Sequence, residues 1–246
     1  MDVTKHVGSN TADRTVAQPE LRVSRAEAEQ AEADFSGFIR DASFPCVGAK
    51  AAEAHNCLTF YHGWSLRSGW DDVALQDELS RFAASYRRDP ALYRSFVALF
   101  HEGGLDGEAE YERFLWERLQ SLSDKDAWRS YPFDESVEPD PVSPHFSLSF
   151  GGLAFFVVGM HPGASRPARR FQLPAMVFNI HDQFAQLRTS GLYETMRKKI
   201  LDRDQSLAGS VNPMLARHGE SSEARQYSGR IVSDEWEAPF RNPRAK

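Results

Sequence analysis

Apolar residues recur every three or four positions in several stretches of the chain, which predicts amphipathic helices. One helix is expected to begin after Ser24, a good N-cap residue, and to carry Phe35, Phe38 and Ile39 on one side. The same spacing predicts further helices over residues 75–86, 91–100, 111–122 and 183–201. Gly191 interrupts the last of these patterns, so a break is expected there.

Other stretches have the composition of β-strands. Residues 57–64 (CLTFYHGW) are rich in aromatic and β-branched side chains. Residues 145–150 alternate in character, Gly151-Gly152 favours a tight turn, and residues 153–158 return, which is a hairpin pattern. The runs 153–158 and 174–179 (PAMVFN) are apolar on both faces and are expected to be central strands. We therefore predict an α+β fold, a single domain whose helices cover a mixed, mostly antiparallel sheet.

Polar stretches suggest how the chain is organised around that sheet. The first 20 residues are polar and lack periodicity, so we predict a mobile tail over 1–20 and one domain over 21–246. Residues 44–50 (FPCVGAK) are expected to form a constrained turn. Residues 203–232 are dense in polar side chains and form either a solvated loop or a polar lid. We expect Trp236 and Phe240 of the WEAPF motif to pin this segment to the core.

Composition excludes several classes of protein. A formal net charge of -6 argues against a general nucleic-acid binder. No apolar run approaches the roughly 20 residues of a membrane-spanning helix, and the polar beginning of the chain lacks a secretory signal. The two cysteines, Cys46 and Cys57, do not make a disulfide framework. We predict a cytoplasmic protein that binds neither nucleic acid nor membrane, and a homodimer stays open.

Most of the candidate chemistry lies between residues 151 and 188. A histidine, His161 or His181, closely follows each of two buried strands, and three arginines lie between them: Arg166, Arg169 and Arg170. An imidazole can bind the iron of a porphyrin, and guanidinium groups can pair with its two propionates. The same residues suit a phosphate or carboxylate ligand. Residue types alone leave both interpretations open.

Other common sites have no counterpart in the sequence. It contains no zinc signature, no GxGxxG loop, no P-loop and no GxSxG nucleophile elbow. Cys46 invites a role as a thiolate ligand or nucleophile. A lone cysteine after a proline is more often a small buried apolar residue.

Four longer motifs carry a resemblance to a known family. They are HPGASRPARRFQLPAMVFNIHDQF, GSVNPML, SEARQYSGR and the early FPCVGAK, and from about residue 30 to its end the chain resembles the YqcI/YcgG family. Members include heme-dependent N-hydroxylases of guanitoxin and D-cycloserine biosynthesis. The resemblance implies a b-type heme, oxygen or peroxide as oxidant, and hydroxylation of a nitrogen of an amino acid, amine or guanidino compound in natural-product biosynthesis.

This resemblance suggests roles for the candidate residues. His161 is expected to be the axial iron ligand, because it leaves a buried strand directly into a proline turn. His181 is the second candidate, as ligand or as distal proton donor. At least two of the arginines named above are expected to hold the propionates, and Cys46 remains a possible thiolate ligand. The family pattern has a cysteine where this chain has Ala238, which excludes a thiolate ligand at that end.

The polar segment is expected to bind the substrate, a small nitrogen compound. The candidate binding residues are Asn212, Glu223, Arg225 and Gln226. Glu223 would pair with a cationic nitrogen, and Glu223 and Tyr227 join His181 as catalytic candidates. An electron-donor reductase is the expected protein partner. The alternative is a non-catalytic heme carrier or gas sensor, which iron coordinated by both His161 and His181 would favour.

Overall fold

The computed structural model describes residues 23–217 and 219–244, so the predicted tail over 1–20 lies outside the described residues. Its strands are β1 (Leu58–Gly63), β2 (Ser95–Phe100), β3 (Leu148–Phe150), β4 (Leu153–Met160) and β5 (Ala175–Ile180). They form one sheet in the order β1-β2-β5-β4-β3. β1 and β2 are parallel, and the other neighbouring strands are antiparallel. The predicted mixed, mostly antiparallel sheet is confirmed.

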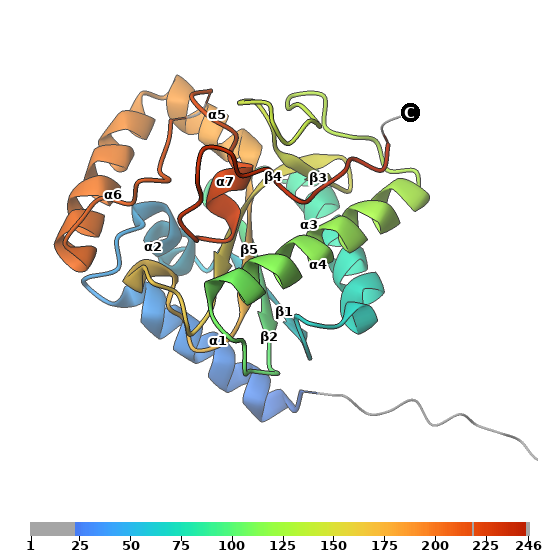
Figure 1. Ribbon diagram of the computed structural model, residues 1–246, viewed down its shortest axis with the longest axis horizontal. Coiled ribbons are helices and arrows are strands. Elements are labelled where there is room, and N and C mark those ends of the chain that lie inside the picture. Colours follow the sequence, from blue (N-terminus) through green and yellow to red (C-terminus); the bar gives the residue numbers. More distant parts are fainter. Residues whose placement is uncertain (1–22, 218, 245–246) are drawn as a thin grey trace, which may run out of the picture.

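Helices cover both faces of this sheet (Figure 1). They are α1 (Arg25–Arg40), α2 (Val47–Ala54), α3 (Asp72–Arg88), α4 (Glu108–Trp128), α5 (His181–Thr189), α6 (Leu192–Ala208) and α7 (Ala224–Tyr227). Two short 3-10 helices, η1 (Gly69–Asp71) and η2 (Pro167–Arg169), complete the elements. One apolar cluster joins α3, α4 and α7 to the sheet, and a second joins α1 to the opposite face. The α+β prediction is therefore confirmed.

The helix predicted over residues 91–100 is wrong, because this segment contains strand β2. Phe96 and Ala98 point into the cluster with α3 and α4, whereas Val97 and Leu99 point into the cluster with α1. All residues of β2 are buried. A short apolar run that is covered on both faces has no period that distinguishes a strand from a buried helix.

The FPCVGAK motif is more than the predicted turn, because helix α2 begins inside it. Cys46 is the N-cap of α2, and its Sγ accepts a hydrogen bond from the backbone N–H of Ala49 at 3.4 Å. Lys50 donates to the carbonyl oxygens of Ile39 and Asp41 at 2.9 and 2.5 Å, at the end of α1. The motif therefore ends one helix and starts the next.

Glycines form the turns where the sequence predicts them. Gly151 and Gly152 have φ angles of 58° and 74° and join β3 to β4, which confirms the hairpin. Gly191, with a φ of 72°, separates α5 from α6. Phe240 is buried and Trp236 packs against the same core cluster as α4, so the WEAPF motif does pin the C-terminal segment.

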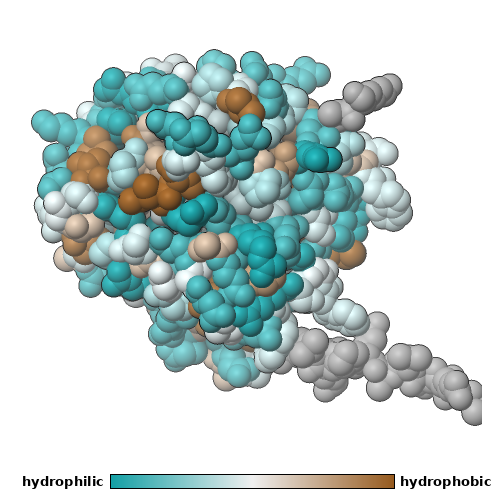
Figure 2. All heavy atoms as spheres, in the orientation of Figure 1, coloured by the Kyte–Doolittle hydropathy of each residue, from teal (hydrophilic) through white to brown (hydrophobic). Residues whose placement is uncertain are grey.

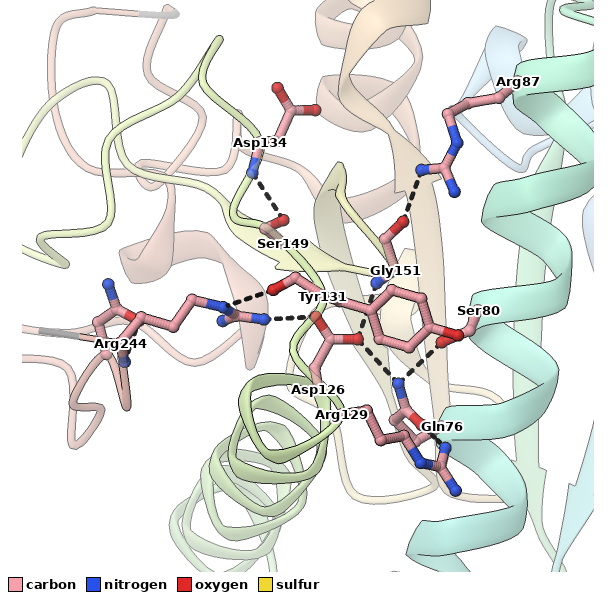
Figure 3. Close-up of polar contacts among 11 residues, drawn as sticks. Gln76, Ser80, Arg87, Asp126, Arg129, Tyr131, Asp134, Ser149, Gly151 and Arg244 are labelled. Carbon is pink, nitrogen blue, oxygen red and sulfur yellow. Dashed lines mark hydrogen bonds and ion pairs between the residues drawn. The ribbon is translucent and has the colours of Figure 1, made fainter.

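A buried polar network fastens this hairpin to the helices behind it (Figure 3). Asp126 of α4 is fully buried and accepts hydrogen bonds from the Gln76 side chain and the Gly151 backbone N–H, both at 2.8 Å. Arg244 donates to its second oxygen at 2.5 Å. One carboxylate thus connects α3, α4, the hairpin turn and the C-terminal segment.

Candidate functional site

A cavity of about 340 Å³ lies between the sheet and the helices α2, α5 and α6. Its walls are mainly apolar, with Phe156 and Val158 contributed by β4 and Met196 and Ile200 by α6. Figure 2 shows apolar side chains gathered on the side of the molecule where α6 lies. A volume of this size is typical of sites for small molecules and cofactors.

Helix α6 forms one wall of the cavity without packing into the core. Asp204 is its single buried residue, although Met196, Ile200 and Leu201 give the helix an apolar side. In α3, a helix of equal length, Leu75 and Leu79 are fully buried among several others. The apolar side of α6 is therefore directed at the cavity, where a ligand can cover it.

Three of the predicted catalytic residues lie together at one end of the cavity. Glu223 accepts hydrogen bonds at Oε1 from the hydroxyls of Ser147 and Tyr227, at 2.7 and 2.6 Å. Its Oε2 is 3.9 Å from Nε2 of His181, which begins α5. Both Glu223 and His181 line the cavity. An acid, an imidazole and a phenol are thus grouped beside an apolar space.

Burial controls the acidity of this group. It raises the pKa of Glu223 to about 7, and the hydrogen bonds from Tyr227 and Ser147 offset only part of that effect. Burial and the neighbouring carboxylate raise the pKa of Tyr227 well above its usual value. A carboxyl group that is half protonated near neutral pH can both accept and donate a proton. Such a shifted group beside a cavity is typical of a functional site.

The three predicted propionate-binding arginines point in different directions. Arg166 lines the cavity but is neutralised by Asp204, at 2.5 Å. Arg169 also lines the cavity and donates to the backbone carbonyl oxygens of Gly159, Gln226 and Tyr227. Arg170 is exposed and lies outside the cavity lining, where its guanidinium donates to the carbonyl oxygens of residues 164 and 165. The three arginines therefore do not form one clamp.

His161, the predicted axial ligand, lies outside the cavity lining. It is buried and stacks on Tyr111 with ring centroids 4.3 Å apart, and burial lowers its pKa. In the β4–β5 register Met160 pairs with Ala175, and Phe155 pairs with the residue before His181. This offset separates Met160 from Ile180 by roughly 17 Å along the strands, and the two histidines follow these residues at opposite ends of the strand pair. They cannot both coordinate one iron.

The remaining predicted residues divide between the cavity and the outer surface. Cys46, Asn212 and Gln226 line the cavity. Burial raises the pKa of Cys46, which disfavours a thiolate. Arg225 is outside the lining and donates to the carbonyl oxygens of Ser233 and residue 234. Part of the polar segment is therefore packed over the site, as the lid alternative predicts.

Sequence reasoning missed two residues of the site. Ser147 is fully buried and holds the Glu223 carboxyl in place, but nothing distinguishes it in the alternating run HFSLSF. Arg188 lines the cavity and lowers the pKa of Glu223 through its charge. It follows His181 by seven positions, two turns along α5, so helical spacing was the signal that could have revealed it.

The fold and site define an α+β protein with an apolar ligand cavity and a buried His–Glu–Tyr group at one end. The model of the YqcI/YcgG family matches residues 35–241, so the chain belongs to the YqcI/YcgG family. Searches of curated proteins and of solved structures gave no significant match. Over the described ranges, no helix is long and apolar enough to cross a membrane.

Proposed function

We propose that this protein is a heme-dependent oxygenase that hydroxylates a nitrogen of a small amino acid, amine or guanidino compound. The observation that carries the proposal is the position of His181, an imidazole that lines an apolar cavity beside the buried carboxyl of Glu223. N-hydroxylation itself comes from the resemblance to heme-dependent N-hydroxylases of this family. The proposed ligand is His181 in place of His161, because only His181 lines the cavity.

The residues of the cavity fit a b-type heme. Apolar side chains of β4 and α6 suit the macrocycle, because removing their apolar surface and that of the ring from water is favourable. His181 would supply a nitrogen ligand to the iron, and the guanidinium of Arg169 or Arg188 would suit a propionate. When bound, heme would supply the oxidising chemistry that adds one oxygen atom to nitrogen. With oxygen as oxidant this consumes two electrons from a reductase and two protons, whereas peroxide needs neither; the other product is water in both cases.

Glu223 would act on the iron ligand and on protons at the site. Its Oε2 is 3.9 Å from Nε2 of His181, so it would orient that ring, and with a pKa of about 7 it can exchange a proton there. Ser147 and Tyr227 fix Oε1 of Glu223 and leave Oε2 on the side of His181.

The absorption spectrum of protein expressed with added heme tests the ligand. We expect a Soret band in the wild type that is lost or displaced in His181→Ala. His161→Ala is the matched control, because it removes a buried histidine outside the cavity lining and should leave the band unchanged. A band lost only in His161→Ala would return the ligand to His161. Absence of the band in the wild type would overturn the heme proposal.

Product analysis separates the oxygenase from a heme carrier or gas sensor. Heme-loaded Glu223→Gln should keep its Soret band, since the amide preserves the shape of the side chain, and should form no N-hydroxylated product. The wild type should convert at least one nitrogen compound when a reductase or peroxide is supplied. A heme-loaded wild type that converts none of a broad set of amino acids, amines and guanidino compounds would favour the carrier or sensor.

A further inference from the structure

Arg169 is a partly buried cation that forms no ion pair with a carboxylate among residues 23–217 and 219–244. Its guanidinium donates to three backbone carbonyl oxygens, of Gly159, Gln226 and Tyr227, at 2.9, 3.1 and 3.3 Å. Arg166, its neighbour on the cavity wall, has an ion pair with Asp204. Desolvation lowers the pKa of Arg169 to about 10, so it is still cationic at neutral pH. A desolvated charge of this kind is usually balanced by a partner of opposite charge.

The side-chain amide of Gln226 lies in the same part of the cavity. It has no hydrogen-bond partner in the described part of the chain. Gln226 is 8% exposed, and its side chain makes no hydrogen bond to any residue in the described part of the chain. Its own backbone carbonyl is bound by Arg169, which keeps the two residues adjacent. Because Gln226 lines the cavity, its amide can donate to a ligand there.

Asn212 adds a second amide to this end of the cavity. Its Oδ1 accepts from the backbone N–H of Met214 at 2.9 Å, which orients the side chain and leaves the NH2 group as the donor. Asn212 is 8% exposed and lines the cavity. Its backbone N–H is held by Asp204, the partner of Arg166, so the position is fixed by the same ion pair.

We propose that Arg169, Gln226 and Asn212 form a carboxylate-binding subsite on the cavity wall, one helical turn beyond Glu223. One guanidinium and two neutral amide donors suit a monoanion with two oxygens. Gly159, whose carbonyl Arg169 binds, is four residues from Phe155, so Arg169 binds β4 roughly 14 Å along the strand from Phe155, the partner of the residue before His181. The cavity wall is mainly apolar, which selects a ligand with an apolar body and an acidic end.

The carboxylate has two possible sources. It is either a propionate of bound heme or the carboxylate of the substrate. The identity of the ligand therefore rests on the proposed function, which either source would extend. The subsite itself does not depend on heme, since its three residues are present in the chain without a cofactor. It can therefore be tested separately from the oxygenase activity.

The test compares octanoate with 1-octanol as ligands of the heme-free protein, by calorimetry and by thermal shift. The two probes share an apolar tail and differ in the carboxylate. We expect the wild type to bind octanoate about tenfold or more tightly than octanol, the size of a charged hydrogen bond. Gln226→Glu should abolish this preference, because a second carboxylate repels the first. The variant should fold, since the Gln226 amide makes no hydrogen bond within the described structure.

Gln205→Glu is the control for added charge, because Gln205 is exposed and outside the cavity lining. It should keep the preference for octanoate. Arg169→Lys gives a second measure, since lysine keeps the charge and loses the planar group, and should weaken octanoate binding more than octanol binding. Equal binding of the two probes by the wild type, or a preference that survives in Gln226→Glu, would overturn the subsite.

A second pair of probes identifies the source of the carboxylate. If the subsite holds a propionate, the wild type should bind heme about tenfold or more tightly than heme dimethyl ester. The Gln226→Glu variant should bind heme and its dimethyl ester equally. If it holds the substrate, heme and its ester should bind equally, and the loaded protein should prefer arginine to agmatine, which lacks the carboxylate. A preference for octanoate in a protein that binds no heme would support the subsite and contradict the proposed function.

Discussion

Asp126 and Glu223 are both buried carboxyls, but they lie in different surroundings. Asp126 accepts hydrogen bonds from a guanidinium, a side-chain amide and a backbone N–H, and these partners come from three parts of the fold outside its own helix (Figure 3). Glu223 receives hydrogen bonds from the two hydroxyls of Ser147 and Tyr227. Its other oxygen faces His181 at the cavity, where a ligand has access.

The difference separates a structural carboxylate from a reactive one. Burial raises the pKa of Asp126 as well, but the Arg244 guanidinium, the Gln76 amide and the Gly151 N–H all oppose that shift, and through them the carboxyl connects elements of the fold. The Glu223 carboxyl, held by two hydroxyls, keeps a pKa that burial raises to about 7, and it lines the cavity. We therefore expect substitution of Asp126 to affect stability, and substitution of Glu223 to affect protonation and ligand binding.

The largest effect on stability should follow Asp126→Ala. The substitution leaves the Arg244 guanidinium and the Gly151 N–H without their acceptor, which should cost about 3–5 kcal/mol in the free energy of unfolding. Urea denaturation measures it. Asp124→Ala on the same helix is the control, because Asp124 is exposed and accepts one bond from Gln120; it should change stability by about 0.5 kcal/mol or less. Equal losses in the two variants would contradict a structural role for Asp126.

Glu223→Gln should change how stability depends on pH. The pKa of Glu223 is about 7 in the folded protein against an ordinary value of 4.5, so between these values the folded state binds the extra proton. Stability of the wild type should therefore fall by about 3 kcal/mol as pH rises through this window. The variant lacks this contribution and should be the more stable of the two at about pH 8.

Denaturation of both proteins from about pH 5 to pH 8 measures the contribution of Glu223. The difference in unfolding free energy between wild type and Glu223→Gln is the useful quantity, because the other titrating groups cancel in it. A difference that is constant over this range would mean that Glu223 ionises normally. The pKa of Glu223 would then be that of an exposed carboxyl group. The proposed difference in role between Glu223 and Asp126 would be contradicted.

A smaller effect should come from the hairpin that Asp126 holds. Gly151→Ala places a side chain on a residue with φ of 58°, and the new Cβ would lie 3.1 Å from the Cα of Ser80. The cost should be about 1–2 kcal/mol in unfolding free energy. Gly37→Ala in α1 is the control, because its Cβ would meet nothing within 4 Å, and it should stabilise by about 0.5–1 kcal/mol. Thermal unfolding of the two variants should therefore shift in opposite directions.

Local patterns predicted many of the elements. Ser24 forms the predicted N-cap with a capping box to Glu27, and the glycine pair at 151–152 forms the predicted hairpin turn. These features depend on neighbouring residues, so a sequence window contains their cause. The strand Ser95–Phe100 was mistaken for helix, because its burial on both faces comes from segments far away in the chain.

The sequence by itself determined which residue types carry the candidate chemistry, and it pointed to His181, Glu223 and Tyr227 together. Tertiary structure decided which of the other candidates join them. The antiparallel register of β4 and β5 places His161 at the far end of the strand pair, and Asp204 forms an ion pair with Arg166, whereas Arg169 binds backbone carbonyl oxygens. Strand register and charge pairing depend on contacts between distant segments, which packing of the whole chain selects and local periodicity does not encode.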